Sequence, residues 1–189
     1  MKEFIIGGAR SGKSALAEQR AQTSHVQSGS HIVYIATAQA GDAEMARRIA
    51  HHRARRPAQW DCVEAPLELA AALRAHADDN ACLVVDCLTL WLANLFFAGA
   101  AAAQAEAGAA PDCALLAGET TALIETLPRL PGRVILVSNE VGCGIVPPQP
   151  LPRLFADEQG RLNQRVAAVC ERVTLVAAGL PLELKPCAD

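Results

Sequence analysis

Gly7-Gly8-Ala9-Arg10-Ser11-Gly12-Lys13-Ser14 is the stretch that decides the fold of this 189-residue sequence. It matches the pattern G-x-x-x-x-G-K-[ST], follows a short apolar run at 3–6 and precedes helix-forming residues at 15–20. A strand, this loop and a helix in that order indicate a P-loop, whose backbone N–H groups and helix N-terminus surround phosphates. We expect Lys13 to meet the β- and γ-phosphates and Ser14 to bind Mg²⁺. The flanking elements disfavour a chance glycine-rich turn, so the motif predicts binding of a nucleoside triphosphate.

Further apolar runs alternate with longer segments of helical pattern. The runs predicted to be buried strands are 3–6, 31–36, 81–85, 134–137 and 173–177. The segments between them are long enough for crossover helices, so we expect a single α/β domain over 1–189 with one open, mostly parallel sheet. Residues 182–184 follow too closely for a crossover and predict an antiparallel edge strand. The Ala-rich segment 98–110 is interpreted as a helix extension or a mobile insertion.

Composition narrows the functional class. The net charge of −3 disfavours a nucleic-acid binder. No signal-peptide pattern is visible, and no apolar stretch approaches the roughly 18 residues of a membrane span, so we expect a cytoplasmic protein without such a span. The 7 cysteines form an odd set without a C-x-x-C pair. They predict reduced thiols rather than a disulfide framework or a zinc ribbon.

An acidic residue ends the third apolar run, in Leu83-Val84-Val85-Asp86. In P-loop proteins a carboxylate at the end of a second strand holds Mg²⁺, directly or through water, and we predict this role for Asp86. The alternative is a helix cap, a role in which Thr89 could share.

A basic helix is predicted after the second apolar run. Asp42 is suited to cap its start and Pro57 to end it. Met45 and Ile49 lie one helical turn apart, and we expect them to face the core.

Another line of this helix carries Arg47, His51 and Arg55 at intervals of four residues. Neighbouring cations disfavour the imidazolium form, so His51 would be a neutral nucleophile near pH 7 while the arginines bind phosphate oxygens. Attack on an α-phosphate would release pyrophosphate and leave a phosphoramidate, which is the first half of nucleotidyl transfer. A solvated basic face with two surface histidines is the alternative, and the residue types alone do not decide between them.

Blocks that follow one another over nearly the whole chain resemble the adenosylcobinamide kinase/guanylyltransferase family. They are Gly7 to Ser14, Tyr34-Ile35-Ala36-Thr37-Ala38, Arg48-Ile49-Ala50-His51-His52-Arg53 with Arg56-Pro57 and Trp60, Asp86-Cys87-Leu88-Thr89 with Asn94-Leu95, Val137-Ser138-Asn139-Glu140-Val141-Gly142 with Gly144-Ile145-Val146-Pro147, and Gly160-Arg161-Leu162-Asn163-Gln164-Arg165-Val166-Ala167. The resemblance implies a RecA-like three-layer sandwich and a homotrimer.

The resemblance also implies site residues. His51 is the position expected to become guanylylated. The other expected nucleotide contacts, beyond the P-loop and Asp86, are Ala36, Thr37, Ala38, His52, Arg53, Ala54, Arg55 and Glu64. Family members can carry Glu where this chain has Asp86, so the shorter carboxylate is expected to reach Mg²⁺ differently. The roles of Glu140, and of Asn163, Gln164 and Arg165 at a trimer interface or a corrinoid cleft, stay open, and Gly142 and Gly144 are equally consistent with a plain turn.

The implied chemistry belongs to cobalamin biosynthesis and has two steps. ATP or GTP phosphorylates the aminopropanol hydroxyl of adenosylcobinamide, and GMP then passes from GTP through His51 to the new phosphate, giving adenosylcobinamide-GDP. Two other classes of protein share parts of the pattern. A monofunctional small-molecule kinase would need Lys13, Ser14 and Asp86 but not His51, and a nucleotide-binding regulatory or ATPase module would transfer nothing.

Overall fold

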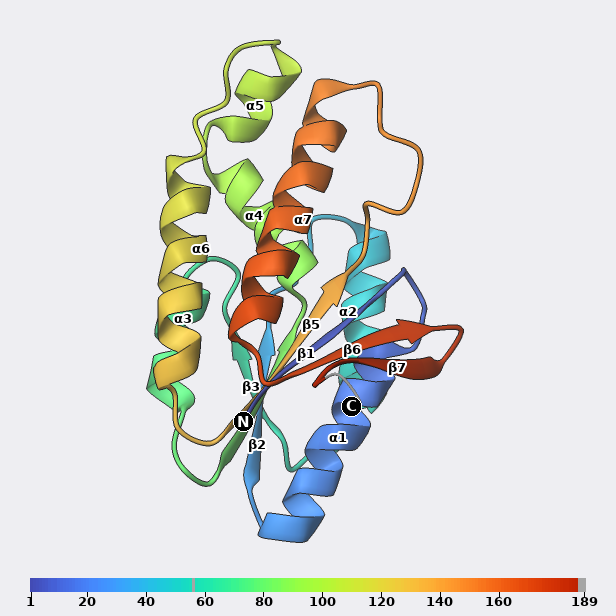
Figure 1. Ribbon diagram of the computed structural model, residues 1–189, viewed down its shortest axis with the longest axis vertical. Coiled ribbons are helices and arrows are strands. Elements are labelled where there is room, and N and C mark those ends of the chain that lie inside the picture. Colours follow the sequence, from blue (N-terminus) through green and yellow to red (C-terminus); the bar gives the residue numbers. More distant parts are fainter. Residues whose placement is uncertain (56, 187–189) are drawn as a thin grey trace.

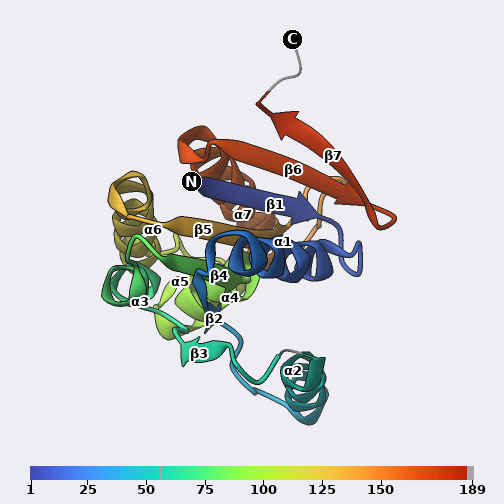
Figure 2. The same ribbon diagram turned by 90° about the horizontal axis from the view of Figure 1, so that it is seen from below.

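The computed structural model describes residues 1–55 and 57–186, and within helix α2 the side chains of Arg48, His51, His52 and Arg55 lie outside this description. In the described ranges the chain forms one sheet with helices on either side (Figure 1). The strand order is β3-β2-β4-β5-β1-β6-β7, which can be followed in Figure 2. Its strands are β1 (Lys2–Gly7), β2 (His31–Ala36), β3 (Asp61–Glu64), β4 (Ala81–Asp86), β5 (Arg133–Asn139), β6 (Arg172–Ala177) and β7 (Leu180–Lys185). All neighbouring strands are parallel except β6 and β7. The predicted, mostly parallel sheet with an antiparallel edge strand is therefore confirmed.

Strand β3 was not expected from the sequence. Asp61, Cys62 and Glu64 are exposed and Val63 is half-buried, so the segment has no apolar run that would indicate a strand. It forms because Val33 to Ala36 of β2 offer a free edge with which it pairs in parallel register. The sheet thus has one more strand than the sequence pattern indicates.

Helices cover both faces of the sheet (Figure 2). They are α1 (Lys13–Ser28), α2 (Ala43–Arg55), α3 (Leu69–His76), α4 (Leu88–Ala98), α5 (Ala101–Glu106), α6 (Ala114–Thr126), the 3₁₀ turn η1 (Leu127–Arg129) and α7 (Pro150–Val169). Ala17 and Ala21 of α1 pack closely against Ile5 and Val84 on one face. Helices α3 to α7 cover the other face around a larger apolar core that contains Trp91.

The Ala-rich segment is packed rather than mobile. Helix α4 ends at Ala98 and α5 follows at Ala101–Glu106. Ala101, Ala102 and Ala105 are all at most 5% exposed, and α5 contacts both α4 and α7. Small side chains let α5 approach its neighbours closely, so the segment extends the helical layer.

Helix α2 stands away from the sheet, beyond β2 and β3 (Figure 2). Asp42 caps its start as predicted, since its Oδ1 accepts the N–H of Met45 at 2.7 Å. The expectation that Met45 and Ile49 enter the core was wrong, because both are only half-buried. Among the side chains of α2 that the structure describes, none is buried.

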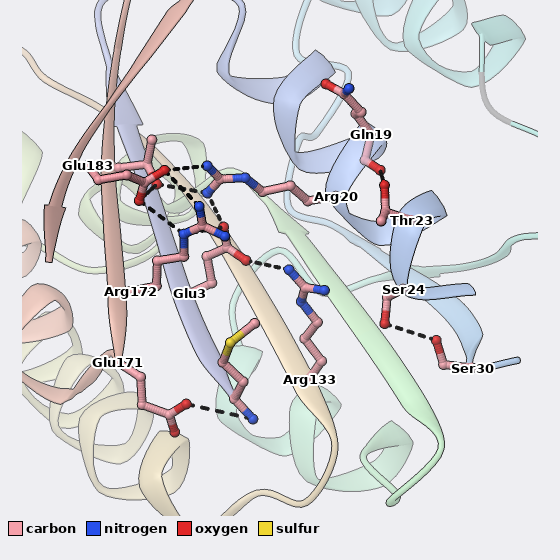
Figure 3. A network of polar contacts seen from close by, with 12 residues as sticks. Glu3, Gln19, Arg20, Thr23, Ser24, Ser30, Arg133, Glu171, Arg172 and Glu183 are labelled. Carbon is pink, nitrogen blue, oxygen red and sulfur yellow. Dashed lines mark hydrogen bonds and ion pairs between the residues drawn. The ribbon is translucent and has the colours of Figure 1, made fainter. Parts of the chain in front are cut away.

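A network of ion pairs around the fully buried Glu3 carboxylate holds α1 to the sheet (Figure 3). Glu3 of β1 is fully buried and accepts hydrogen bonds from Arg20 of α1 and, at 2.8 Å, from Arg133 of β5. Arg20 also donates to Glu183 of β7 at 2.6 Å, and Arg172 donates to the same carboxylate at 2.9 and 3.0 Å. Each of the two carboxylates is paired with at least two guanidinium groups, so the helix that follows the P-loop is fixed against β1, β5 and the edge hairpin.

Membrane spans and cysteines were the two features that the sequence addressed for the chain as a whole. No helix within the described ranges is long and apolar enough to cross a membrane. The cysteines in these ranges are free thiols, of which Cys82, Cys87 and Cys170 are buried. Burial raises the pKa of each of these three thiols to about 11 or about 12, which leaves them unreactive near neutral pH.

Candidate active site

The P-loop joins the end of β1 to the start of α1. A Cβ on Gly7 would lie 2.4 Å from the carbonyl oxygen of Val176, so only glycine fits there. Gly12 has a φ of 99°, which also favours glycine, and Lys13 begins α1. The Nζ of Lys13 donates to the carbonyl oxygen of Gly8 at 2.9 Å, across the loop. The loop is therefore already wrapped into a concave shape.

The other P-loop residues differ in how far they are exposed on the concave side of the loop. Gly8, Ala9 and Arg10 are exposed, and Ser14 is half-buried in the first turn of α1. The hydroxyl of Ser11 is buried and without a hydrogen-bond partner among the described residues. The helix N-terminus carries no acidic side chain in its first turn, so its positive end is free to face an anion.

Asp86 lies at the carboxyl end of β4, near Lys13. Burial lowers the pKa of the Lys13 ammonium, while the nearby Cys87 and Asp86 act in the opposite direction. The hydroxyl of Tyr34 donates to Oδ2 of Asp86 at 2.7 Å and fixes the carboxylate. Lys13, the Asp86 carboxylate and the P-loop thus meet at the carboxyl ends of the parallel strands, which we call the phosphate edge of the sheet.

The alternative role of Asp86 as a helix cap is wrong. Helix α4 has Cys87 at its N-cap position and no side-chain cap hydrogen bond. The hydroxyl of Thr89 instead accepts the N–H of Asn139 at 2.8 Å. The Asp86 carboxylate is therefore not used to cap α4.

The residues of the edge fit Mg²⁺. Asp86 and Ser14 offer a carboxylate and a hydroxyl, the hard oxygen ligands that this ion prefers. No group of three or more His, Cys, Asp or Glu side chains suited to a metal occurs among the described residues.

Ala36, Thr37 and Ala38 follow the carboxyl end of β2, beside Asp86. The Thr37 side chain is fully buried, and its hydroxyl donates to the carbonyl oxygen of Cys87 at 2.8 Å and accepts the Cys87 N–H at 2.9 Å. Ala36 and Ala38 are half-buried on either side. Thr37 therefore ties the ends of β2 and β4 together, and the contact of these three residues with a nucleotide stays a prediction.

Two further predicted nucleotide contacts meet across a cavity. Arg53 of α2 donates to Oε1 of Glu64 at the end of β3. Both residues line a cavity of about 290 Å³, together with Tyr34 and Trp60. The indole N–H of Trp60 is buried and has no partner among the described residues. Because Tyr34 also touches Asp86, the cavity borders the phosphate edge.

His51, the predicted nucleophile, lies on α2, the helix whose Arg53 lines this cavity. His51 and His52 precede Arg53 on α2, and Ala54 is exposed. The side chains of His51, His52 and Arg55 lie outside the described part of the chain, so their roles stay predictions.

Polar residues on α7 were assigned no definite role from the sequence. Asn163 is buried, 6% exposed, and its Nδ2 donates to the carbonyl oxygen of Asn139 at 3.1 Å. Arg165 donates to Thr120 and Thr121 of α6, both at 3.2 Å, whereas Gln164 is exposed. Asn163 thus supports the end of β5 from inside the fold.

Several residues around the site were missed by sequence reasoning. Tyr34 appeared only within a strand block, and Ser138 and Gln159 were given no role. The strand register was the available signal for Tyr34, since it lies two residues before Ala36, the partner of Asp86 in the β2–β4 pairing. Nothing local indicates the pairing of Gln159 with Ser138, because it depends on how α7 folds back.

The chain is similar to known proteins over nearly its whole length. A family model described as cobinamide kinase / cobinamide phosphate guanyltransferase matches residues 3–184. The bifunctional adenosylcobalamin biosynthesis protein CobP of Pseudomonas aeruginosa is 55% identical over 185 residues, which cover 98% of this chain and 98% of that protein. The corresponding protein CobU of Escherichia coli is 40% identical over 98% of this chain and 100% of its own length.

Solved structures share the fold at low sequence identity. The ATPase EscN of the enteropathogenic E. coli type III secretion system has a TM-score of 0.55 and 14% identity, over 94% of this chain and 43% of its own chain. A second type III secretion ATPase has a TM-score of 0.54 and 12% identity, over 96% of this chain and 56% of its own. This chain spans only about half of these ATPases, and the likeness shows the predicted P-loop fold alone.

Proposed function

Since this chain belongs to the cobinamide kinase / cobinamide phosphate guanyltransferase family, we propose that it phosphorylates adenosylcobinamide with ATP or GTP and then transfers GMP from GTP to the new phosphate. The product is adenosylcobinamide-GDP, an intermediate of cobalamin biosynthesis, and the enzyme is a transferase. The observation that carries the proposal is that the P-loop, Asp86 and the Arg53–Glu64 pair, which joins α2 to β3, all lie at the carboxyl ends of the parallel strands.

In the kinase step the aminopropanol hydroxyl oxygen attacks the γ-phosphorus and the bond to the β-phosphate oxygen breaks. The hydroxyl proton leaves to solvent or to a base. Backbone N–H groups of residues 8–14 and the Lys13 ammonium neutralise charge on the phosphate oxygens. Lys13 would exchange its present contact with Gly8 for these oxygens.

In the second step a ring nitrogen of His51 attacks the α-phosphorus of GTP and pyrophosphate departs. An oxygen of the corrinoid phosphate then attacks the same phosphorus, and the phosphorus–nitrogen bond breaks. Arg53, and Arg55 on the same helix, would bind phosphate oxygens. One P-loop serves both steps, because it binds the phosphates that transfer in the first and those that leave in the second.

Mg²⁺ is part of the proposal, held by Ser14 and Asp86. Bound there with a nucleoside triphosphate, it would supply positive charge that stabilises developing negative charge on phosphate oxygens. Tyr34 supports this role because its hydroxyl orients the Asp86 carboxylate.

The cavity beside Arg53 and Glu64 supports a role in binding the nucleoside of GTP. Its aromatic wall includes Trp60, and the Glu64 carboxylate accepts hydrogen bonds. Guanine presents two N–H donor groups on one edge, which a carboxylate can accept. As part of the same proposal the enzyme works in the cytoplasm as a homotrimer.

The test supplies the purified chain with adenosylcobinamide, Mg²⁺, ATP and GTP and follows the corrinoid by mass spectrometry. The proposal expects adenosylcobinamide phosphate first and adenosylcobinamide-GDP second. Phosphate addition without GMP transfer would indicate a monofunctional kinase. Nucleotide hydrolysis with unchanged corrinoid would indicate an ATPase module and contradict the proposal.

A further inference from the structure

Asn139 ends the strand that lies between the P-loop strand and the Asp86 strand. Strand β5 pairs with β1 on one side and with β4 on the other. In the β1 pairing Asn139 lies opposite Gly7, the first residue of the P-loop, and in the β4 pairing Val137 lies opposite Asp86. The main chain continues this contact, since the N–H of Glu140 donates to the Gly7 carbonyl at 3.0 Å.

The alternation of side chains along β5 places Asn139 on the catalytic face. Val137 packs in the apolar cluster beneath α1, together with Ala17. Ser138 points to the opposite face, where its hydroxyl contacts α7. Asn139 therefore shares the α1 face with Val137 and Asp86. Its carboxamide is half-exposed there and has no hydrogen bond to any described residue.

Buried side chains hold the backbone of Asn139 from the other face. Its N–H donates to the hydroxyl of Thr89 at 2.8 Å, and its carbonyl accepts from Asn163 at 3.1 Å. Oδ1 of Asn163 in turn accepts from Ser138 at 2.8 Å and from Gln159 at 3.0 Å. Helices α4 and α7 are thereby both bonded to the last residues of β5.

This cluster is not what stability alone would favour. Gln159 and Ser138 are fully buried, yet Oε1 of Gln159 has no partner among the described residues. A buried acceptor without a partner weakens a fold, and an apolar side chain at this position would avoid the loss. What the cluster does provide is a fixed position for the end of β5.

We propose that Asn139 is a catalytic residue, whose carboxamide donates a hydrogen bond to the γ-phosphoryl group in the kinase step. Asn163, together with Ser138 and Gln159, is a positioning residue that fixes Asn139. This inference rests on the proposed function. The amide makes and breaks no covalent bond. It is neutral at every working pH, so it stabilises the equatorial phosphate oxygens without adding an ionisation to the pH profile.

The inference separates the two steps. During phosphoryl transfer to the corrinoid, charge shifts on the γ-phosphoryl group itself. During guanylylation of His51 the γ-phosphate is part of the leaving pyrophosphate, one group away from the reacting phosphorus. Loss of the Asn139 amide should therefore slow the first step far more than the second.

The test measures both steps in Asn139→Ala. We expect kcat for adenosylcobinamide phosphorylation to fall about 10²-fold, as for loss of one preorganised donor. The KM for ATP and the rate of histidine guanylylation should change less than about threefold. Asn163→Ala should lower the same kcat about tenfold with an unchanged pH profile, because it loosens Asn139 without touching substrate. Asn80→Ala, exposed at the opposite end of β4, is the matched control.

The outcomes divide clearly. An Asn139→Ala enzyme that phosphorylates at the wild-type rate, or that loses both steps equally, overturns the inference. If this variant does not fold, the isosteric Asn139→Asp decides, because its carboxylate repels the phosphate and should slow phosphorylation at least as much. A wild-type chain that phosphorylates no corrinoid contradicts the proposed function itself. This failure can be told from a failure of the Asn139 inference because it is seen in the wild type, before any variant is compared.

Discussion

Helices α1 and α2 are each bonded to the sheet through an arginine–glutamate pair, but the two pairs differ greatly in burial. Glu3, which binds Arg20 of α1, is 0% exposed and the Arg20 side chain 12%. Arg53 of α2 and Glu64 are 54% and 65% exposed. Buried alanines also pack α1 on the sheet, whereas no described side chain of α2 is buried.

The difference corresponds to the two halves of the proposed chemistry. The helix that begins at the P-loop is fixed, which suits a cradle that must bind phosphates in both steps. Among the described residues, the helix that carries His51 makes few buried contacts. Segments with few buried contacts open at low free-energy cost. A group that receives GMP at one place and delivers it to a large corrinoid benefits from such freedom.

The largest expected effect comes from the shared cradle. Lys13→Ala should lower both corrinoid phosphorylation and guanylylation on the order of 10³-fold, because the ammonium serves both. Steady-state kinetics of each step check this. Lys185→Ala is the control, since among the described residues the hydrogen bonds of that ammonium go to carbonyl oxygens near the end of α7. A Lys13→Ala enzyme that retains one of the two activities would show that the cradle is not shared.

The next effect is on stability. Arg20→Met removes one partner of the fully buried Glu3 carboxylate and should lower the free energy of unfolding by about 3 kcal/mol in urea titrations. Arg161→Met, which breaks the exposed pair with Glu158, should change it by less than about 0.5 kcal/mol. Equal effects would mean that the buried network does not anchor α1.

Acid should weaken the same network. Hydrogen bonds from Arg172 hold the pKa of Glu183 at about 2, below its ordinary value of 4.5. A carboxylate with a lowered pKa stabilises the fold above its unfolded pKa, and this stabilisation is lost as the pH falls from about 4.5 to about 2. The urea midpoint of unfolding should fall less steeply with falling pH in Glu183→Gln than in the wild type. Glu106 is exposed at the end of α5, and Glu106→Gln should keep the wild-type dependence of the midpoint on pH. An unchanged slope in Glu183→Gln would contradict the assignment.

The smallest expected effect is at the α2 pair. Arg53→Met should change the free energy of unfolding by less than about 1 kcal/mol, since both partners are largely exposed and screened by water. The same variant should slow guanylylation if Arg53 binds phosphate oxygens. A loss of stability as large as that in Arg20→Met would remove the contrast between the two helices.

The parts of this molecule that were predictable carry a local signal. The P-loop and the buried strands have compact patterns, and Asp42 is a recognisable cap. Strand β3 lacks such a pattern, because it is an exposed edge that forms only by pairing with β2. The packing of α2 was misjudged because an amphipathic pattern does not show whether a partner surface lies opposite.

The supports of the site depend on long-range contacts. Glu3 has the ordinary appearance of a polar residue at a strand start, and its arginine partners lie 17 and 130 residues away. Tyr34 and Asp86 are 52 residues apart and meet only through the β2–β4 register. Candidate site residues such as Lys13 and Asp86 could therefore be named from local patterns, and their roles stay predictions, whereas the contacts of Glu3 and Tyr34 emerged only from the fold.

In the proposed mechanism a histidine on the loosely held helix α2 carries GMP, while the fixed P-loop holds the leaving phosphates. Incubation with GTP labelled at the α-phosphate tests it most directly. The wild-type chain should acquire an acid-labile, alkali-stable label, His51→Ala should acquire none, and a corrinoid phosphate acceptor should discharge the label. Two results would contradict this mechanism. One is a wild-type enzyme that forms adenosylcobinamide-GDP without ever becoming labelled, and the other is a His51→Ala variant that becomes labelled as fully as the wild type.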